Sequence, residues 1–330
     1  MREVFLAAGA HWTSGDGDAP EDANRLRRMD RFGRAGYLAG TRAFAAAGLA
    51  REERPHPRCG VIVGTRHGCR SAITEHAARL EAATRVEDLA PSVFAATVHN
   101  TVNGELAIAL GLGGVSEAIV SGRTAGLEAL ILGAHRVAAG DADRILVVAA
   151  EGIDDAMRDA WEEEKLALGA RAAGVDLVET AAAVLLEAEG ISSNGDEKSG
   201  ERIRFLESCL FFEPDARRAG ARFFEWMKNV EERACGGAVP PAVVTLCTPE
   251  YEDFLEGNRE KEKKRGQEEK PRVERFGVAG LYEIAREVPS RRAQTTAVLP
   301  PQLPSQKILD AFVTRDMTGA VAAVALESWS

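Results

Sequence analysis

The side chains best suited to chemistry in this sequence are its histidines and cysteines. The six histidines are His11, His56, His67, His76, His99 and His135, so none follows residue 135. The five cysteines are widely spread, at Cys59, Cys69, Cys209, Cys235 and Cys247. Their odd number and the lack of a Cys-x-x-Cys pair argue against a disulfide framework and against a zinc site. We therefore expect no metal and no histidine base from the second half of the chain.

A second group of candidates lies in the segment Ile119-Val-Ser-Gly-Arg-Thr-Ala-Gly. It places Ser121 and Arg123 just ahead of an apolar run over residues 124–139, which predicts a helix buried on nearly all sides. Ser121 has the hydroxyl of a nucleophile, but no suitably placed histidine supports it. A structural serine before a helix is the favoured interpretation. Arg123 is always charged and is not a nucleophile.

The elements that must position these residues follow from hydrophobic periodicity. Short β-branched runs predict strands, and apolar residues three and four apart predict helices. The predicted strands are 4–8, 59–65, 117–121 and 145–150, and the predicted helices are 25–47, 71–83, 93–110 (broken near Gly104) and 124–139. Gly48 and Gly140 follow two of these helices, at the usual position of a C-terminal cap. The alternation of strands and helices indicates a layered α/β protein.

The two halves of the sequence end alike. Residues 180–188 and 319–327 are both strands of small apolar residues, and each has a glutamate at or next to its end. This similarity suggests an internal duplication. We predict one half over residues 1–190 and a second over 201–330, with a polar linker at 191–200. A dense run of mixed charge at 258–270 is typical of a solvated helix.

Composition excludes several classes of protein. The net charge is −10 and the pI is about 5.3, with no basic stripe of the kind that nucleic-acid binders show. Because no stretch of eighteen apolar residues occurs, we expect no membrane span. The N-terminal apolar run is too short for a signal peptide. These features predict a cytoplasmic protein that binds neither nucleic acid nor membrane.

Several of these segments resemble the β-ketoacyl synthases. Arg27-Arg-Met-Asp-Arg-Phe is similar to the start of their early helix, and Gly60-Val-Ile-Val-Gly to the strand that follows. The most specific match is Ala118-Ile-Val-Ser-Gly-Arg-Thr-Ala-Gly-Leu-Glu-Ala-Leu, which is similar to their nucleophile elbow and buried helix. The similarity is greatest to the chain-length factors of type II polyketide systems. It implies a thiolase-like fold, with duplicated halves in a layered αβαβα arrangement and a second half shorter than in the family.

The resemblance also shows which catalytic groups are missing. Condensing enzymes of this family hold the acyl chain on a cysteine at the elbow and use two histidines from the second half. Here Arg123 occupies the nucleophile position, while Cys247 and Leu281 lie near the histidine positions. Arg123 would block the acyl site and pair with an acidic group at the interface; the alternative is an ordinary surface arginine before a helix. Loss of three catalytic groups is hard to reconcile with condensation by this chain alone.

A stripe of residues at helical spacing is the candidate for control of product length. Phe94, Thr97, Val98 and Thr101 are three or four residues apart. In chain-length factors the matching helix lies at the subunit interface and borders the tunnel for the growing chain. The alternative is that these side chains form ordinary core or dimer packing.

The favoured function is that of a chain-length-factor-like, non-catalytic subunit without cofactor. Its expected partners are a catalytic ketosynthase, in a heterodimer, and an acyl carrier protein. Two alternatives remain at this point: an active thiolase-fold acyltransferase or decarboxylase with an unrecognised nucleophile, and a structural homodimeric scaffold.

Overall fold

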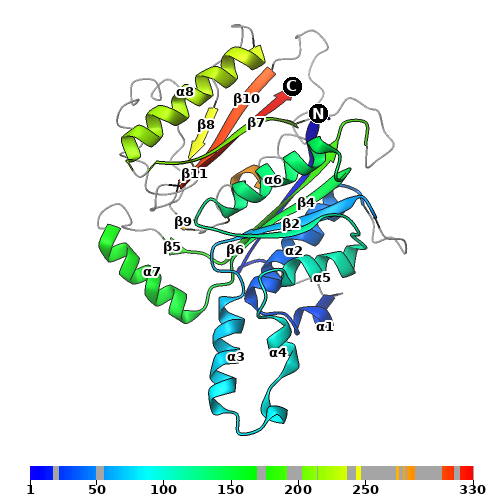
Figure 1. The fold of residues 1–330 in the computed structure, drawn as a ribbon, viewed down its shortest axis with the longest axis vertical. Helices are drawn as coiled ribbons and strands as arrows, with labels where there is room; N and C mark the ends of the chain where they lie inside the picture. The colour runs from blue at the N-terminus through cyan, green and yellow to red at the C-terminus, as the bar shows by residue number, and fades with distance from the viewer. Residues whose placement is uncertain are drawn as a thin grey trace.

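A computed structural model describes most of the chain, and Figure 1 shows its fold. The described residues are 1–17, 22–49, 56–168, 176–191, 203–213, 215–235, 243–246, 273–274, 278, 281–286, 307–315 and 320–329.

Nine strands form one sheet whose order is β3-β2-β4-β6-β1-β7-β11-β10-β8. Its first five strands, taken in chain order, are β1 (Val4–Thr13), β2 (Cys59–Thr65), β3 (Ser116–Val120), β4 (Arg144–Ala150) and β6 (Thr180–Ala188). The other four are β7 (Ile203–Phe212), β8 (Val243–Leu246), β10 (Lys307–Arg315) and β11 (Ala320–Trp329). A separate pair joins β5 (Asp176–Leu177) to β9 (Val273–Glu274).

The two groups of strands meet through a short pairing of β1 with β7, in which Val4, Phe5 and Leu6 face Phe205, Arg204 and Ile203. The strand order on each side of this junction is similar. In each group the strand that comes last in the sequence, β6 or β11, lies between two earlier strands. Glu187 of β6 pairs with Arg144 at 2.8 Å, and Glu327 of β11 pairs with Arg204 at 2.5 Å. Each glutamate thus pairs with an arginine of a neighbouring strand, but β4 and β7 are not corresponding strands, so it is the similar strand order that supports the predicted duplication. The linker at 191–200 stays a prediction, since 192–200 lie outside the described residues.

Helices cover both groups of strands. They are α1 (Ala23–Leu26), α2 (Arg31–Ala46), α3 (Arg70–Ala82), α4 (Pro91–Ala95), α5 (Thr101–Leu110), α6 (Ala125–Ala139), α7 (Asp155–Leu168) and α8 (Ala216–Cys235), with a 3₁₀ turn at Val86–Asp88 and a short helical segment at 281–286. Figure 1 shows α3 and α4 side by side in an arm that projects from the body.

The packing defines five layers. One buried cluster joins α2 and α5 to the first group of strands, and another joins α8 to β10 and β11. Between them, a third cluster joins α6 and residues 281–286 to strands of both groups. Helix α6 is therefore central and, as its composition predicts, buried on most sides. The expected thiolase-like αβαβα arrangement is confirmed.

Two helix predictions were wrong, one because it was continuous and the other because its break was misplaced. The helix expected over 25–47 is interrupted, because Asp30 acts as an N-cap and accepts a hydrogen bond from the Gly33 amide at 2.7 Å, which starts a new helix at Arg31. The helix expected over 93–110 is two helices, α4 and α5, and the break lies at residues 96–100 instead of at Gly104. There the hydroxyls of Thr97 and Thr101 donate to backbone carbonyls of Phe94 and Val98, in competition with helical bonding.

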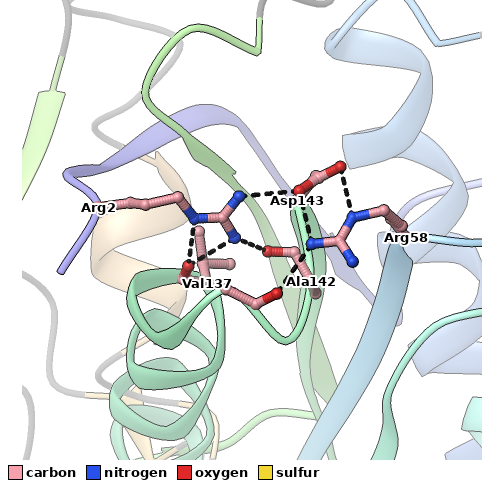
Figure 2. A network of polar contacts seen from close by, with 6 residues as sticks. Arg2, Arg58, Val137, Ala142 and Asp143 are labelled. Atoms are coloured by element: carbon pink, nitrogen blue, oxygen red, sulfur yellow. Dashed lines mark hydrogen bonds and ion pairs between the residues drawn. The ribbon is translucent and has the colours of Figure 1, made fainter.

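A network of arginines secures the start of the chain to the end of α6 (Figure 2). Arg2 donates to the carbonyl oxygens of Val137 and Ala142 and to the carboxylate of Asp143, and Arg58 binds the same carboxylate from the other side. The Val137 carbonyl lies in the last turn of α6, at the negative end of the helix dipole, where cations are favourable. The network therefore fixes the C-terminal end of α6 relative to β1 and β4.

Candidate functional site

The candidate site lies where three parallel strands end. Strands β3, β2 and β4 run in the same direction, so the loops that follow them gather at one edge of the sheet. These loops carry Arg66 and His67 after β2, Ser121 and Arg123 after β3, and Glu151 after β4. The edge therefore brings together residues that are far apart in the sequence.

Arg123 is buried at this edge, with 2% of its surface exposed. Its Nη2 lies 3.0 Å from Oε1 of Glu164, and its guanidinium carbon lies 6.0 Å from the centre of the Trp161 ring. Both partners belong to α7, at positions i and i+3 on one helical face. The interpretation as a surface arginine is wrong. The acidic partner is supplied by the same chain and not, as we expected, from an interface.

Glu164 also forms an ion pair with a second arginine. Nη2 of Arg66 lies 3.8 Å from Oε2 of Glu164, so the two carboxylate oxygens face different guanidiniums. Glu164 is itself only 15% exposed. Its carboxylate therefore bridges the loop after β2 and the loop after β3.

The loop after β2 is held by a different carboxylate. Glu151 is buried and accepts hydrogen bonds from the backbone amides of Arg66 and His67 and from the hydroxyl of Thr65. The Thr65 hydroxyl in turn accepts from the Gly68 amide at 2.8 Å. These bonds satisfy the polar groups of a buried turn, and they orient Arg66 toward Glu164.

The hydroxyls beside Arg123 are also engaged. Glu128, in the first turn of α6, accepts hydrogen bonds from Ser121 at 3.0 Å and from Thr124. An acidic residue in the first turn is favoured by the helix dipole. Ser121 is thus bound to a carboxylate and has no imidazole beside it among these contacts, so the structural interpretation of this serine is supported.

The turn between β3 and α6, residues 121–124, is called the elbow here, and the start of α6 that follows it packs closely against strand β2. A Cβ added at Gly64 would overlap the carbonyl oxygen of Ala125, the first residue of α6. Only glycine permits this approach, which fixes the start of α6 against the end of β2. The position of residue 123 is therefore set by the backbone around it.

The predicted length-control stripe does not lie on one helix. Phe94 belongs to α4, Thr97 and Val98 lie in the bend, and Thr101 is the first residue of α5. Phe94 is 61% exposed and lies against His76 of α3, with ring centres 5.4 Å apart. Val98 is also exposed, and Thr97 and Thr101 are partly buried. The interpretation of this stripe as core packing within the chain is therefore not supported for Phe94 and Val98.

The other predicted positions contribute little to this edge. Leu281 is fully buried, lies in the helical segment 281–286 and packs in the central cluster. Cys247 lies outside the described residues. Cys59 is buried in β2, and burial raises the pKa of its thiol to about 12, as expected for a small hydrophobic residue.

A cysteine and histidine pair was missed by the sequence analysis. Sγ of Cys69, the residue before α3, lies 3.6 Å from Nδ1 of His99, which is in the bend between α4 and α5. The Cys69 side chain is fully buried, and burial raises the pKa of its thiol. A reactive thiol needs exposure and a lowered pKa, so this pair has the properties of a structural contact.

Glu164 and Trp161 were missed as well, since nothing in the sequence links them to a residue some forty positions earlier. One signal was present. Met157, Trp161 and Glu164 follow helical spacing on a segment whose other residues are largely acidic or exposed. Such a stripe predicts a helix that rests on the protein along one narrow face.

Within the described residues, no group of three or more His, Cys, Asp or Glu side chains is placed to hold a metal ion. Over the same part of the chain, no helix is both long and apolar enough to cross a bilayer.

Comparison with known proteins agrees with this architecture. The family model "Beta-ketoacyl synthase, N-terminal domain" matches residues 16–189, which is more than half of the chain. Relatives named 3-oxoacyl-[acyl-carrier-protein] synthase 2 are 35% identical in Vibrio cholerae and 34% identical in Vibrio harveyi, each over 126 residues. These matches cover 38% of this chain and only 30% of either relative.

Solved structures match over nearly the whole chain. The ishigamide ketosynthase/chain length factor superposes with a TM-score of 0.73 at 17% identity, over 98% of this chain and 99% of that one. A type II PKS acyl-carrier protein in complex with its ketosynthase bound to the hexaketide gives a TM-score of 0.75 at 17% identity, over 99% of both chains. At such identities the structural likeness shows the fold alone. The family match over residues 16–189 establishes that the chain belongs to the beta-ketoacyl synthase family.

Proposed function

We propose that this chain is a non-catalytic, chain-length-factor-like subunit that pairs with a catalytic ketosynthase and limits the length of the product. The observation that carries the proposal is the buried Arg123 at the end of β3, held by Glu164 and packed near Trp161. An arginine cannot form the thioester that condensation needs. Its described partners are Glu164 and Trp161, and neither supplies the missing thiol.

The histidines support the same proposal. No histidine follows His135 in the sequence, and His135 is exposed on α6. Of the two histidines near the edge, His67 lies 3.4 Å from the buried Glu151 and His99 lies beside Cys69. Neither contact resembles a base poised over an open substrate site. Chemistry would therefore have to come from another chain.

The surface near β3 supports a protein partner. Strand β3 is at the edge of the sheet and its residues alternate between exposed and partly buried. Val120 of β3, Ile108 of α5, and Phe94 and Val98 before α5 are all exposed. An open sheet edge and exposed apolar side chains are each costly in water unless a partner covers them. We name these four residues the β3-edge patch, and we assign to it the binding of the ketosynthase.

The names of similar proteins bear on the partners. One structural neighbour is a ketosynthase/chain length factor, and another contains an acyl-carrier protein with its ketosynthase. By analogy, this chain would meet an acyl carrier protein as part of the same complex. The relatives with higher identity are named as synthases, so an active enzyme is the alternative that the experiment must separate.

The test is co-expression with a ketosynthase encoded nearby, followed by purification on a tag carried by this chain alone. We expect the two proteins to co-purify, and we expect elongation only in the complex. Mass spectrometry of carrier-bound chains then compares Phe94→Ala, which should lengthen products, with Thr97→Trp, which should shorten them. Elongation by this chain without a partner would establish the active enzyme. A stable homodimer that retains no ketosynthase would establish the structural scaffold.

A further inference from the structure

Two guanidiniums converge on one carboxylate at the edge of the sheet. Arg123 and Arg66 approach different oxygens of Glu164, at 3.0 and 3.8 Å. The planar guanidinium group is the side chain best matched to a carboxylate. Trp161 lies across the guanidinium of Arg123 and shields it from water. The two arginines together have the composition of a carboxylate-binding site, and Glu164 occupies it. Trp161 lies on the same helix as Glu164, so it covers Arg123 only while that helix is in place.

The helix that supplies Glu164 is held by a small apolar contact. Over residues 155–166, the part of α7 whose side chains are described, those buried are Met157 and Trp161, which pack with Ile153 in a cluster separate from the three main cores. Most other side chains of α7 are exposed, among them the acidic Asp155, Asp159, Glu162 and Glu163. An element with so little buried apolar surface opens at low free-energy cost. The occupant of the site can therefore leave without unfolding the sheet.

We propose that the Arg66 and Arg123 pair forms a binding site for a carboxylate on a short aliphatic stem, and that α7 is a lid which fills this site with Glu164 until such a ligand displaces it. The chemical class follows from the occupant, since the Glu side chain is equivalent to propionate. This inference goes beyond the proposed function and does not depend on a partner subunit.

The experiment is designed around the competition between the Glu164 carboxylate and a free carboxylate ligand. A tethered group competes at an effective concentration in the millimolar range or above, so a free carboxylate binds the wild type weakly. Glu164→Gln removes the charge of the occupant and keeps its shape. We expect this variant to bind propionate at least about tenfold more tightly than the wild type. Glu163→Gln is the matched control, because it removes the same charge from an exposed neighbour on the same helix.

Binding is measured as the rise in melting temperature with sodium propionate, at an ionic strength held constant with sodium chloride. Hydrogen exchange of the α7 peptide is followed in the same samples. This measurement reports the opening of α7 itself, and it can be made with or without a bound partner. We expect Glu164→Gln to increase exchange in α7 and to give a saturable response to propionate. Adding Arg123→Met to Glu164→Gln should abolish that response.

An equal response in Glu164→Gln and Glu163→Gln would overturn the proposal, as would a response to sodium sulfate as large as that to propionate. If Glu164→Gln does not fold, exchange in the wild type decides the question. There, concentrated propionate should raise the exchange of α7 amides above the level seen with sodium chloride, and no such rise would refute the site. Failure of the chain to bind a ketosynthase would leave these measurements unaffected.

Discussion

Arg58 binds Asp143 through two parallel hydrogen bonds, with Nε 2.8 Å from Oδ2 and Nη2 2.9 Å from Oδ1. Arg2 binds the same carboxylate at 2.9 Å from the opposite side, as Figure 2 shows. The hydrogen bonds from Arg58 and then from Arg2 lower the pKa of Asp143 to about 2. In an unfolded chain the pKa of an aspartate is about 3.9. The folded state therefore binds the ionised form more favourably.

Replacement of Asp143 by asparagine should lower the free energy of unfolding by about 1 kcal/mol at pH 7, because the site is partly exposed and solvent screens the pairs. The stabilisation from a lowered carboxylate pKa is present above pH 4 and is lost as the pH falls toward 2. The deficit of Asp143→Asn relative to the wild type should therefore shrink over that range. Urea unfolding at several pH values measures it. Asp141→Asn, an exposed neighbour, should change stability by less, and an equal effect would show that Asp143 has no special role.

The pair formed by Arg123 and Glu164 should show energetic coupling. A double-mutant cycle with Arg123→Met and Glu164→Gln isolates the interaction from the effect of each substitution. We expect a coupling of about 1–2 kcal/mol, less than for a fully buried pair, since Arg66 keeps a contact with Glu164. The same cycle made with Glu163→Gln should give a coupling near zero. If both cycles give the same value, the contact does not stabilise the fold.

The β3-edge patch should be required for partner binding. Phe94→Asp places a charge in a surface that is predicted to be covered, so the ketosynthase should no longer co-purify. Phe212→Asp is the matched control, because Phe212 on β7 is also 61% exposed and lies in the other group of strands. We expect this control to retain the partner. Loss of the partner in both variants, or in neither, would contradict the assignment of the patch.

Two glycines should respond in opposite ways to alanine. Gly64→Ala forces a Cβ onto the carbonyl oxygen of Ala125 and should cost about 2–3 kcal/mol. Gly104 lies inside α5 with open space around it, so Gly104→Ala should stabilise the chain by about 0.5–1 kcal/mol through helix propensity. Chemical denaturation of both variants measures the difference. A Gly64→Ala protein as stable as the wild type would show that the elbow is not fixed as described.

Restoring a thiol at the elbow should not create a synthase. Arg123→Cys supplies the family's nucleophile, but the second half of the sequence still contains no histidine. We expect no malonyl-dependent elongation from this variant alone, as measured by mass spectrometry of carrier-bound chains. The complex of the wild-type chain with an active ketosynthase serves as the positive control. Elongation by Arg123→Cys without a partner would rule out the proposed loss of catalysis.

Much of the fold could be predicted because local sequence and tertiary packing agree. The run from 124 to 139 is apolar on nearly every side, and α6 is indeed central, ending at Gly140 with a positive φ of 91°. The small-residue strands that became β6 and β11 pack on both faces, which explains why they lack an alternating pattern.

The errors arose where a side chain competes with the backbone or where contacts span a long stretch of sequence. The bend between α4 and α5 depends on the hydroxyls of Thr97 and Thr101, while hydrophobic spacing alone continues through it. At the site, the sequence identified Arg123 and its resemblance to a nucleophile position. It could not identify Glu164, because which acidic residue of α7 reaches the elbow is decided by the packing of Trp161.

The position of the last strand in each group has a consequence for synthesis on the ribosome. Strand β6 lies between β4 and β1, so the first group can close its sheet once residue 188 has emerged. Strand β11 lies between β7 and β10, and it comprises residues 320–329. Until it emerges, β7 and β10 have no common neighbour, and the edges of these two strands that pair with β11 stay open. The first group can therefore fold during translation, whereas the second needs protection from aggregation until its final strand arrives.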